Sequence, residues 1–268
     1  MPHYLCKTCG VQYPPADAPP AACPICEDER QYVGHKGQEW LLTASLAETH
    51  TPDIRQIEPG LTGIGMKPGF AIGQRALLIQ SAGGNVLWDC TPLLTDEVIQ
   101  QVNALGGITA MAISHPHFYA TMATWAETFD VPVYIHAAER PWVVEPHANV
   151  QFWDGDTHPL HDDMTLIRCG GHFKGGQVLH WPGGAAGKGA LLTGDILFVT
   201  RDRQHVSFMY SFPNYIPLSP SKVRHITAML YPYAYDRIYS AWDGAVLPEN
   251  AKQQVAISAK RYIDAVTD

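Results

Sequence analysis

The sequence predicts an α/β domain preceded by a small unit that a metal ion holds together. Three observations carry this prediction. From Gly69 onward, short apolar segments of strand length alternate with segments of helical pattern. Four of the six cysteines lie within the first 26 residues of a 268-residue chain, in two close pairs. Most of the 13 histidines lie between His115 and His225, which also suggests metal chemistry.

Composition excludes some classes of binding partner and indicates where in the cell the protein is found. Apolar residues make up 46% of the chain, charged residues 16%, and the net charge is −8. An acidic chain without a Lys/Arg cluster is a poor ligand for nucleic acid or an anionic membrane, so neither is expected as a partner. No apolar run reaches membrane-spanning length, and the N-terminus lacks the pattern of a signal peptide. We therefore expect a cytoplasmic protein.

The chain is expected to contain two domains, residues 1–37 and 38–268. Residues 38–60 are predicted to be a connecting segment, because they lack a clear period and are interrupted by Pro52 and Pro59. The strands expected after it are 76–80, 85–89, 108–114, 131–136, 164–169, 177–181, 190–193 and 238–241. The expected helices are 96–105, capped by Thr95 and stopped by Gly106 and Gly107, then 121–129, 221–230 and 250–266, with a helix or loop over 137–144.

The cysteines of the first unit have the spacing of a metal site. Cys6-x2-Cys9 is followed after thirteen residues by Cys23-x2-Cys26. Each pair offers two thiolates from one tight turn, and two such turns form a closed tetrahedral site. Disulfides are disfavoured, because a chain without a signal peptide is not expected in an oxidising compartment.

The knuckle sequences Tyr4–Gly10 and Cys23–Cys26 resemble those of rubredoxin. The resemblance leaves two metals open, a structural Zn²⁺ and a redox-active iron, since both suit four thiolates. The unit lacks the aromatic core and the length of rubredoxin, which favours structural Zn²⁺. The first domain is therefore interpreted as a zinc ribbon.

A second group of potential ligands occurs at strand ends of the α/β domain. His115 and His117 follow the strand 108–114, His172 stands in the glycine-rich run 169–176, and Asp195 follows the strand 190–193. Three imidazoles and one carboxylate suit Zn²⁺ or Fe²⁺.

These motifs, in this order, resemble the metallo-β-lactamase superfamily. The matching residues are Asp89 at the end of an early strand, His115 and His117 of the HxHxDH motif, His172 of the GH-x-x-G element, and Asp195 of the GD pair. The resemblance implies a four-layer αββα sandwich with the metal site between the sheets. It covers the chain from about Gly69 to the C-terminus.

The chain departs from the family pattern at the second metal site. Tyr119 and Ala120 replace the Asp and the last His of HxHxDH, and Trp242 stands where a late histidine is expected. Alanine and tryptophan cannot bind an ion, so we expect a mononuclear site. Tyr119 has two interpretations, a donor of a hydrogen bond to a developing oxyanion or a residue that only fills the space of the second metal site.

Three functions remain open at this stage. The leading one is a metallohydrolase that uses metal-bound hydroxide on an ester, thioester or phosphoester, with Asp195 and Tyr119 as its catalytic residues. The second is a mononuclear iron oxidoreductase of persulfides, whose ligands would be His115, His172 and Asp195. The third is a non-catalytic protein that binds metal or a partner. A small-molecule substrate is expected, with anionic compounds among the candidates because of Arg201 and Arg203. A homo-oligomer is one option for the assembly.

Overall fold

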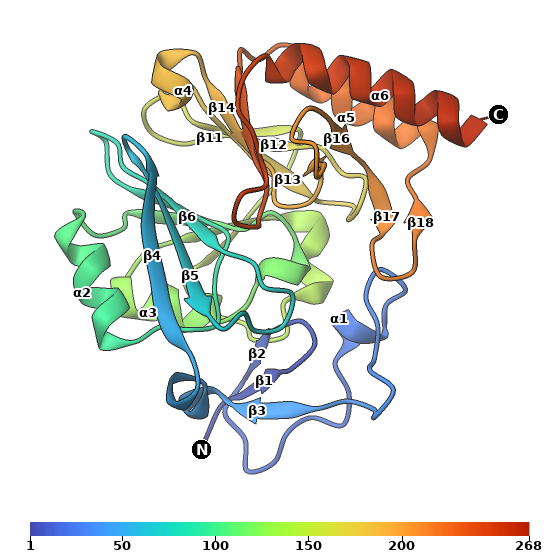
Figure 1. The fold of residues 1–268 in the computed structure, drawn as a ribbon. Coiled ribbons are helices and arrows are strands. Elements are labelled where there is room, and N and C mark those ends of the chain that lie inside the picture. Colours follow the sequence, from blue (N-terminus) through green and yellow to red (C-terminus); the bar gives the residue numbers. More distant parts are fainter. Residues whose placement is uncertain (268) are drawn as a thin grey trace. The chain divides into compact units, whose positions relative to one another are not determined.

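The computed structural model describes residues 1–267, which fall into two compact units (Figure 1). Unit 1 comprises Met1–Ile135 and Arg140–Phe152. Unit 2 comprises His136–Glu139 and the residues from Trp153 onward. Each unit contains one large β-sheet and smaller sheets or helices around it.

The N-terminal part of unit 1 is a small antiparallel sheet with the strand order β2-β1-β3. Its strands are β1 (Tyr4–Cys6), β2 (Gln12–Tyr13) and β3 (Trp40–Leu42), and it includes the short helices α1 (Pro24–Glu27) and η1 (Thr43–Glu48). Leu5 of β1 is fully buried in a cluster with Leu46 and Leu93. The small sheet therefore shares an apolar cluster with the rest of unit 1.

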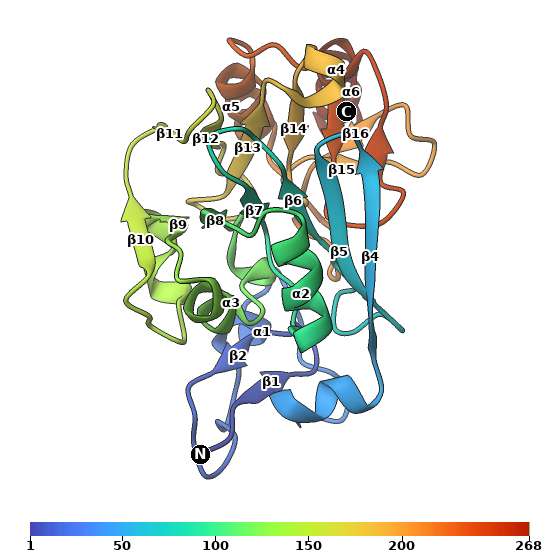
Figure 2. The ribbon, with the colours of Figure 1, turned by 90° about the vertical axis from the view of Figure 1, so that its left-hand side faces the viewer.

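The large sheet of unit 1 has seven strands in the order β10-β9-β8-β7-β6-β5-β4. Their bounds are β4 (Thr51–Glu58), β5 (Leu61–Lys67), β6 (Ala76–Ile79), β7 (Val86–Trp88), β8 (Ala110–Ala112), β9 (Val133–His136) and β10 (Val150–Trp153). Strands β7, β8 and β9 are parallel. The helices α2 (Asp96–Ala104) and α3 (Met122–Phe129) connect them and lie on one face of the sheet (Figure 2). This arrangement brings the carboxyl ends of three strands to one edge.

Local sequence explains the limits of these helices. The Thr95 hydroxyl accepts a hydrogen bond from the Val98 amide at the start of α2. Gly106 follows the helix at φ 106°, a conformation that glycine adopts without steric cost. Helix α3 ends at Asp130, which is in the left-handed conformation at φ 51°.

The large sheet of unit 2 has six strands in the order β11-β12-β13-β14-β19-β20. Their bounds are β11 (Thr157–Pro159), β12 (Thr165–Arg168), β13 (Gln177–Trp181), β14 (Ala190–Leu192), β19 (Arg237–Tyr239) and β20 (Val246–Leu247), with the short helix α4 (Gly184–Gly187) between β13 and β14. Two small hairpins lie between β14 and β19, formed by β15 (Phe198–Val199) with β16 (Val206–Ser207) and β17 (Met209–Ser211) with β18 (Ile216–Pro217).

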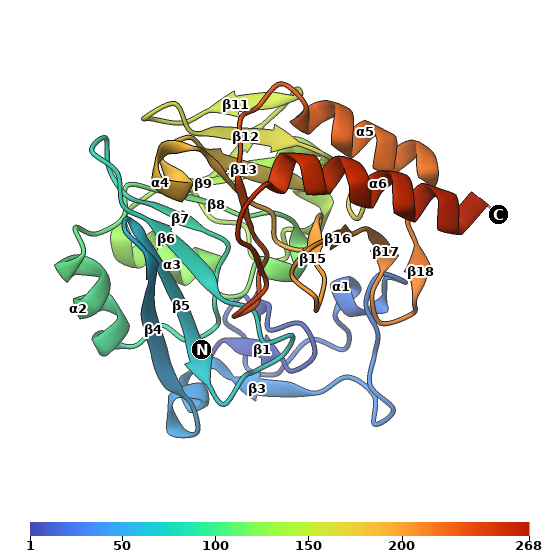
Figure 3. The same cartoon turned by 45° about the horizontal axis from the view of Figure 1, so that its top comes forward.

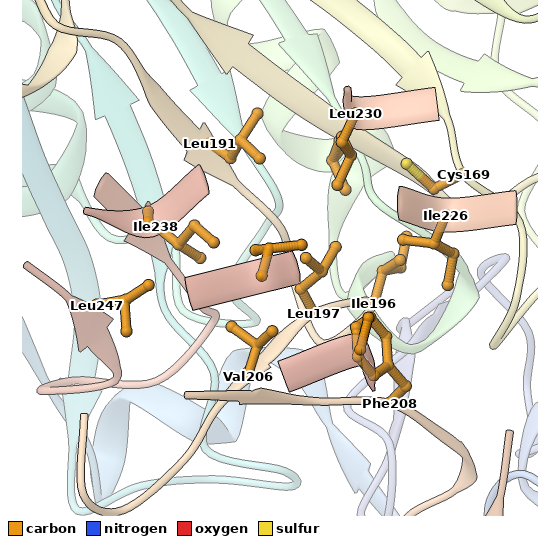
Figure 4. Packing of buried hydrophobic residues seen from close by; sticks show 14 of the residues in the cluster. Cys169, Leu191, Ile196, Leu197, Val206, Phe208, Ile226, Leu230, Ile238 and Leu247 are labelled. Atoms are coloured by element: carbon orange, nitrogen blue, oxygen red, sulfur yellow. The ribbon is translucent and has the colours of Figure 1, made fainter. Parts of the chain in front are cut away.

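Two long helices cover this sheet. Helices α5 (Pro220–Leu230) and α6 (Ala251–Thr267) run side by side (Figure 3) and contact β12 and β19. Between them and the sheet lies an apolar core that includes Leu191, Ile226 and Ile238 (Figure 4). Burial of these side chains, each worth about 1.5–3 kcal/mol, explains the apolar stripes of the two helices.

The predicted elements from residue 76 onward are confirmed, with ends that differ by one or two residues for most of them. The prediction for residues 38–60 is wrong, because this segment contains β3, η1 and β4. Strand β4 is an edge strand, a position in which proline such as Pro52 is tolerated and in which most side chains are only partly buried. An edge strand therefore lacks the apolar pattern that reveals a central one. The boundary at residue 37 stays a prediction.

No helix among residues 1–267 combines the length and the apolar character that crossing a membrane would require.

Candidate metal sites

The four N-terminal cysteines form one buried group within unit 1. Their sulfur atoms lie within 4.8 Å of one another, and each cysteine is at most 1% exposed. The distances are 3.5 Å from Cys6 to Cys26 and 3.7 Å from Cys9 to Cys23, well beyond a disulfide bond of about 2.05 Å. Two knuckle turns produce this geometry, because the Gly10 amide donates to the Cys6 carbonyl and the Cys26 amide to the Cys23 carbonyl.

The chemistry of this group fits a cation. Hydrogen bonds from the neighbouring thiols, that of Cys23 first, lower the pKa of Cys6, and the same proximity raises the pKa of Cys9. Without a cation, four such thiols cannot all ionise, because their thiolates repel one another. A divalent ion removes this repulsion and has the ligands it requires. The Gln38 amide also donates to the Cys6 sulfur at 3.2 Å, a contact that stabilises a thiolate.

Unit 1 also contains the first two histidines of the second group. They follow β8, on either side of the first residue of the short helix η2 (Pro116–Phe118), and both are buried. Their ring centroids are 5.1 Å apart, and their ligand nitrogens lie within 4.8 Å of each other. The Ser114 hydroxyl is 3.1 Å from His115 Nδ1, so His115 would bind a metal through Nε2.

Asp89 supports this loop from the neighbouring strand. It follows β7 in the left-handed conformation at φ 59°, which Asp and Asn tolerate better than other residues. Its Oδ1 accepts a hydrogen bond of 2.7 Å from the Ser114 amide, and the side chain is buried. Burial raises the pKa of Asp89 to about 7.

Asp89→Asn is expected to change how stability depends on pH in the metal-depleted protein. Because the folded pKa of about 7 exceeds the unfolded value of 3.8, the native state binds more protons between these values. The free energy of unfolding should therefore fall as pH rises from about 4 to about 7, by up to about 1.4 kcal/mol per pH unit. Asn retains the acceptor and the backbone conformation but not the titration, so this slope should flatten in urea titrations across the range. An unchanged slope would contradict the assignment to Asp89.

Unit 2 contains the other two residues of the second group. His172 stands in a turn between β12 and β13 that Gly170 and Gly171 form at φ 64° and 84°. The Tyr210 carbonyl accepts a hydrogen bond of 2.7 Å from His172 Nδ1, which directs Nε2 toward Asp195, whose Oδ2 is 4.0 Å away. Asp195 follows β14 and Gly194, and both ligand residues are at most 4% exposed.

Glu139 holds the end of this turn at Gly175. No role for Glu139 was predicted from the sequence. The Gly175 amide donates a short hydrogen bond to Glu139 Oε1, and Glu139 is 1% exposed. A Cβ atom on Gly175 would lie 2.8 Å from both Glu139 Oε1 and His136 Nδ1. Only glycine therefore fits between these side chains, a requirement that the run of glycines in the sequence could have signalled.

The three residues at the expected second metal site are found in both units. Tyr119 and Ala120 of unit 1 are buried, and Ala120 is in the left-handed conformation at φ 43°. Trp242 of unit 2 is partly buried, with its ring 5.3 Å from that of Phe198. The centroid of the Phe212 ring is 5.3 Å from that of Phe198 and 5.7 Å from that of His172. The immediate surroundings of His172 in unit 2 are therefore aromatic.

The segment after Asp195 forms the two hairpins. Arg203 in the first hairpin donates a hydrogen bond to the Val246 carbonyl at 3.2 Å, while Arg201 is exposed. Of the two predicted anion-binding arginines, one therefore has a structural contact.

Comparisons with known proteins identify a relative and the fold. No family model matches the sequence. The chain is 49% identical over 268 residues to the uncharacterized protein YmaE of Bacillus subtilis (strain 168), which covers 99% of this chain and 97% of that protein. DIM-1 metallo-β-lactamase has a TM-score of 0.59 at 14% identity, over 80% of this chain and 98% of its own. A B3 metallo-β-lactamase with an active-site glutamic acid has a TM-score of 0.57 at 14% identity, over 89% and 97%. These structures confirm the predicted metallo-β-lactamase fold.

Proposed function

The chain belongs to the family of the Bacillus subtilis protein YmaE and has the metallo-β-lactamase fold, and on this premise we propose that it is a metal-dependent hydrolase. We propose further that one ion is bound by four residues, His115 and His117 of unit 1 with His172 and Asp195 of unit 2.

The observation that carries this proposal is the chemistry of the two pairs. Each pair presents buried ligand atoms within 4.8 Å of each other, on turns that hydrogen bonds hold in place. Buried imidazoles and carboxylates are costly unless a cation or hydrogen bonds satisfy them. The alignment with DIM-1 covers 80% of the chain, more than either unit contains, so the shared fold extends over parts of both. This supports the assignment of the two pairs to one site.

A single ion is favoured by the residues at the expected second site. Ala120 and Trp242 have no group that binds a metal, and Tyr119 offers only a phenol. When bound, the ion would lower the pKa of a water molecule and polarise the oxygen of a carbonyl or phosphoryl group.

The chain's own residues would then complete the chemistry. His115 and His172 would bind the ion through rings whose other nitrogen has a hydrogen-bond partner that fixes their direction, and His117 would supply the third imidazole. A carboxylate oxygen of Asp195 would accept the proton of the attacking water. The Tyr119 hydroxyl would donate a hydrogen bond to the developing oxyanion, an interaction that the dry surroundings of this 1% exposed side chain would strengthen. Esters, thioesters and phosphoesters are the substrate classes that this chemistry serves.

His115→Ala should leave about one ion per chain where the parent protein holds about two. It should also remove turnover of p-nitrophenyl esters, thioesters and phosphodiesters, because the site loses one of three imidazoles. Elemental analysis and these assays measure both effects. His50→Ala, which changes a histidine bonded to Leu46 and Thr49 in the same unit, should retain both properties. If the parent and His115→Ala proteins both hold about one ion, the hydrolase proposal fails and a binding role replaces it.

A second candidate is a mononuclear iron enzyme that oxidises persulfides. It is favoured by the cysteine group, since four buried thiolates suit iron as well as zinc. Iron at both sites together with oxygen uptake in the presence of glutathione persulfide would support it. Zinc at the histidine site with ester turnover would exclude it.

A further inference from the structure

The cysteine group and the His115–His117 loop lie in unit 1 and are connected through hydrogen bonds of Gln12. Gln12 of β2 is buried at 2% exposure between them. Its backbone amide donates to the Ala120 carbonyl at 2.9 Å. Ala120 lies three residues after His117, in the unusual left-handed conformation. The backbone amide of Gln12 therefore holds the end of the loop that carries both histidines.

The side chain of Gln12 extends this connection. Its amide nitrogen donates to Thr124 Oγ1 at 2.9 Å and to Glu145 Oε2 at 3.0 Å. Thr124 belongs to α3, the helix that follows the histidine loop, and Glu145 lies after β9. Buried hydrogen bonds of this kind are specific in direction and costly to leave unmade. Gln12 thus connects the N-terminal segment that carries the cysteine group to α3, which follows the histidine loop, and to the segment of Glu145.

Two apolar contacts also join the N-terminal segment that carries the cysteine group to the rest of unit 1. Leu5 shares its core with Leu46 and Leu93. Gly10, at φ 77°, approaches so closely that a Cβ atom would lie 3.1 Å from Pro92 Cγ and 3.2 Å from Ala71 Cβ. The position of Gln12 consequently depends on the knuckle turn just before it, and the ends of that turn are the ligands Cys6 and Cys9.

From these contacts we propose that Gln12 couples the cysteine group to the loop of His115 and His117. Metal at the cysteine site orders the knuckle, the knuckle positions Gln12, and Gln12 holds the loop in the conformation in which its histidines bind an ion. The expected effect of this coupling on metal affinity rests on the proposed function. Its expected effect on the order of the loop does not. Because linkage is reciprocal, an ion at the histidine site strengthens binding at the cysteine site by the same factor. Gln12 is a positioning residue in this scheme.

The test uses the full chain of the parent protein and of Gln12→Leu, loaded with metal at the cysteine site for hydrogen exchange and depleted of metal for the titration. Hydrogen exchange of peptides spanning residues 114–122 reports the order of the loop, whose amides at Phe118, Tyr119 and Met122 donate to nearby carbonyls. Cobalt(II) titration of the metal-depleted protein reports affinity, because thiolate-to-cobalt charge-transfer bands distinguish the cysteine site from the histidine site. Lys7→Ala, an exposed change in the same unit, is the control.

We expect Gln12→Leu to speed exchange over residues 114–122 by about tenfold and to weaken cobalt binding at the histidine site by about tenfold or more. Thr124→Val, which removes one acceptor without changing shape, should produce a smaller shift in the same direction and serves if Gln12→Leu does not fold. Lys7→Ala should change neither. Unchanged exchange in the folded Gln12 and Thr124 variants would overturn the coupling. Faster exchange in Gln12→Leu, together with a parent protein that binds only one cobalt ion, would support the coupling and refute the proposed function.

Discussion

Cys6→Ser should remove one ion per chain and lower stability by several kcal/mol. Structural zinc contributes on the order of 10 kcal/mol in small metal-folded units, and a hydroxyl is a poor replacement for one of four thiolates. The small sheet shares its apolar core with the rest of unit 1 through Leu5, so a loosened knuckle would also weaken that core. Elemental analysis and thermal unfolding, followed by circular dichroism, measure the two effects.

Cys169→Ser is the matched control for this change. Cys169 is also fully buried, and burial raises the pKa of its thiol, but it lies in the apolar core of unit 2. Its replacement should cost stability through the buried hydroxyl while the metal content stays at the parent value. A Cys6→Ser protein that retains its full metal content would show that the cysteine group does not hold an ion.

Glu139→Ala should weaken metal binding at the histidine site by about 10- to 100-fold, the range found when groups that orient metal ligands are removed. The carboxylate accepts the hydrogen bond of the Gly175 amide, three residues after His172. Its loss leaves a buried donor without that acceptor, at a cost of about 1–3 kcal/mol, and allows the turn to move. Competition with a chelator gives the affinity, and the pH profile of turnover gives a second readout.

Glu139→Gln distinguishes positioning from general destabilisation. The glutamine amide retains an oxygen that can accept from Gly175, so metal affinity should return to within a few-fold of the parent. If Glu139→Ala binds metal as tightly as the parent protein, the turn does not depend on Glu139. If both variants lose affinity equally, the charge rather than the acceptor is what the site requires.

Sequence alone predicted the elements whose residues carry a strong local pattern. The strands β6 to β9, β12 to β14 and β19 and the helices α2, α3, α5 and α6 follow from apolar periodicity and from caps such as Thr95 and Gly106, whereas the short strands β10, β11, β15 to β18 and β20 were not predicted. The edge strand β4 was not predicted, because its exposed residues and Pro52 interrupt the apolar pattern of a strand. Local propensity therefore identifies central strands better than edge strands.

The candidate ligand sets were also predicted from the sequence, since CxxC pairs and histidines at strand ends have the spacing that metal chemistry requires. What only the tertiary structure decided is the support around those ligands. Gln12 meets Glu145 across 133 positions, Glu139 meets Gly175 across 36, and the Tyr210 carbonyl meets His172 across 38. Gln12, Glu139 and Tyr210 have no local signature of these contacts, because a hydrogen bond between distant segments depends on how the strands and turns pack. The sequence thus specified which residues can hold a metal, and packing specified which residues hold them in place.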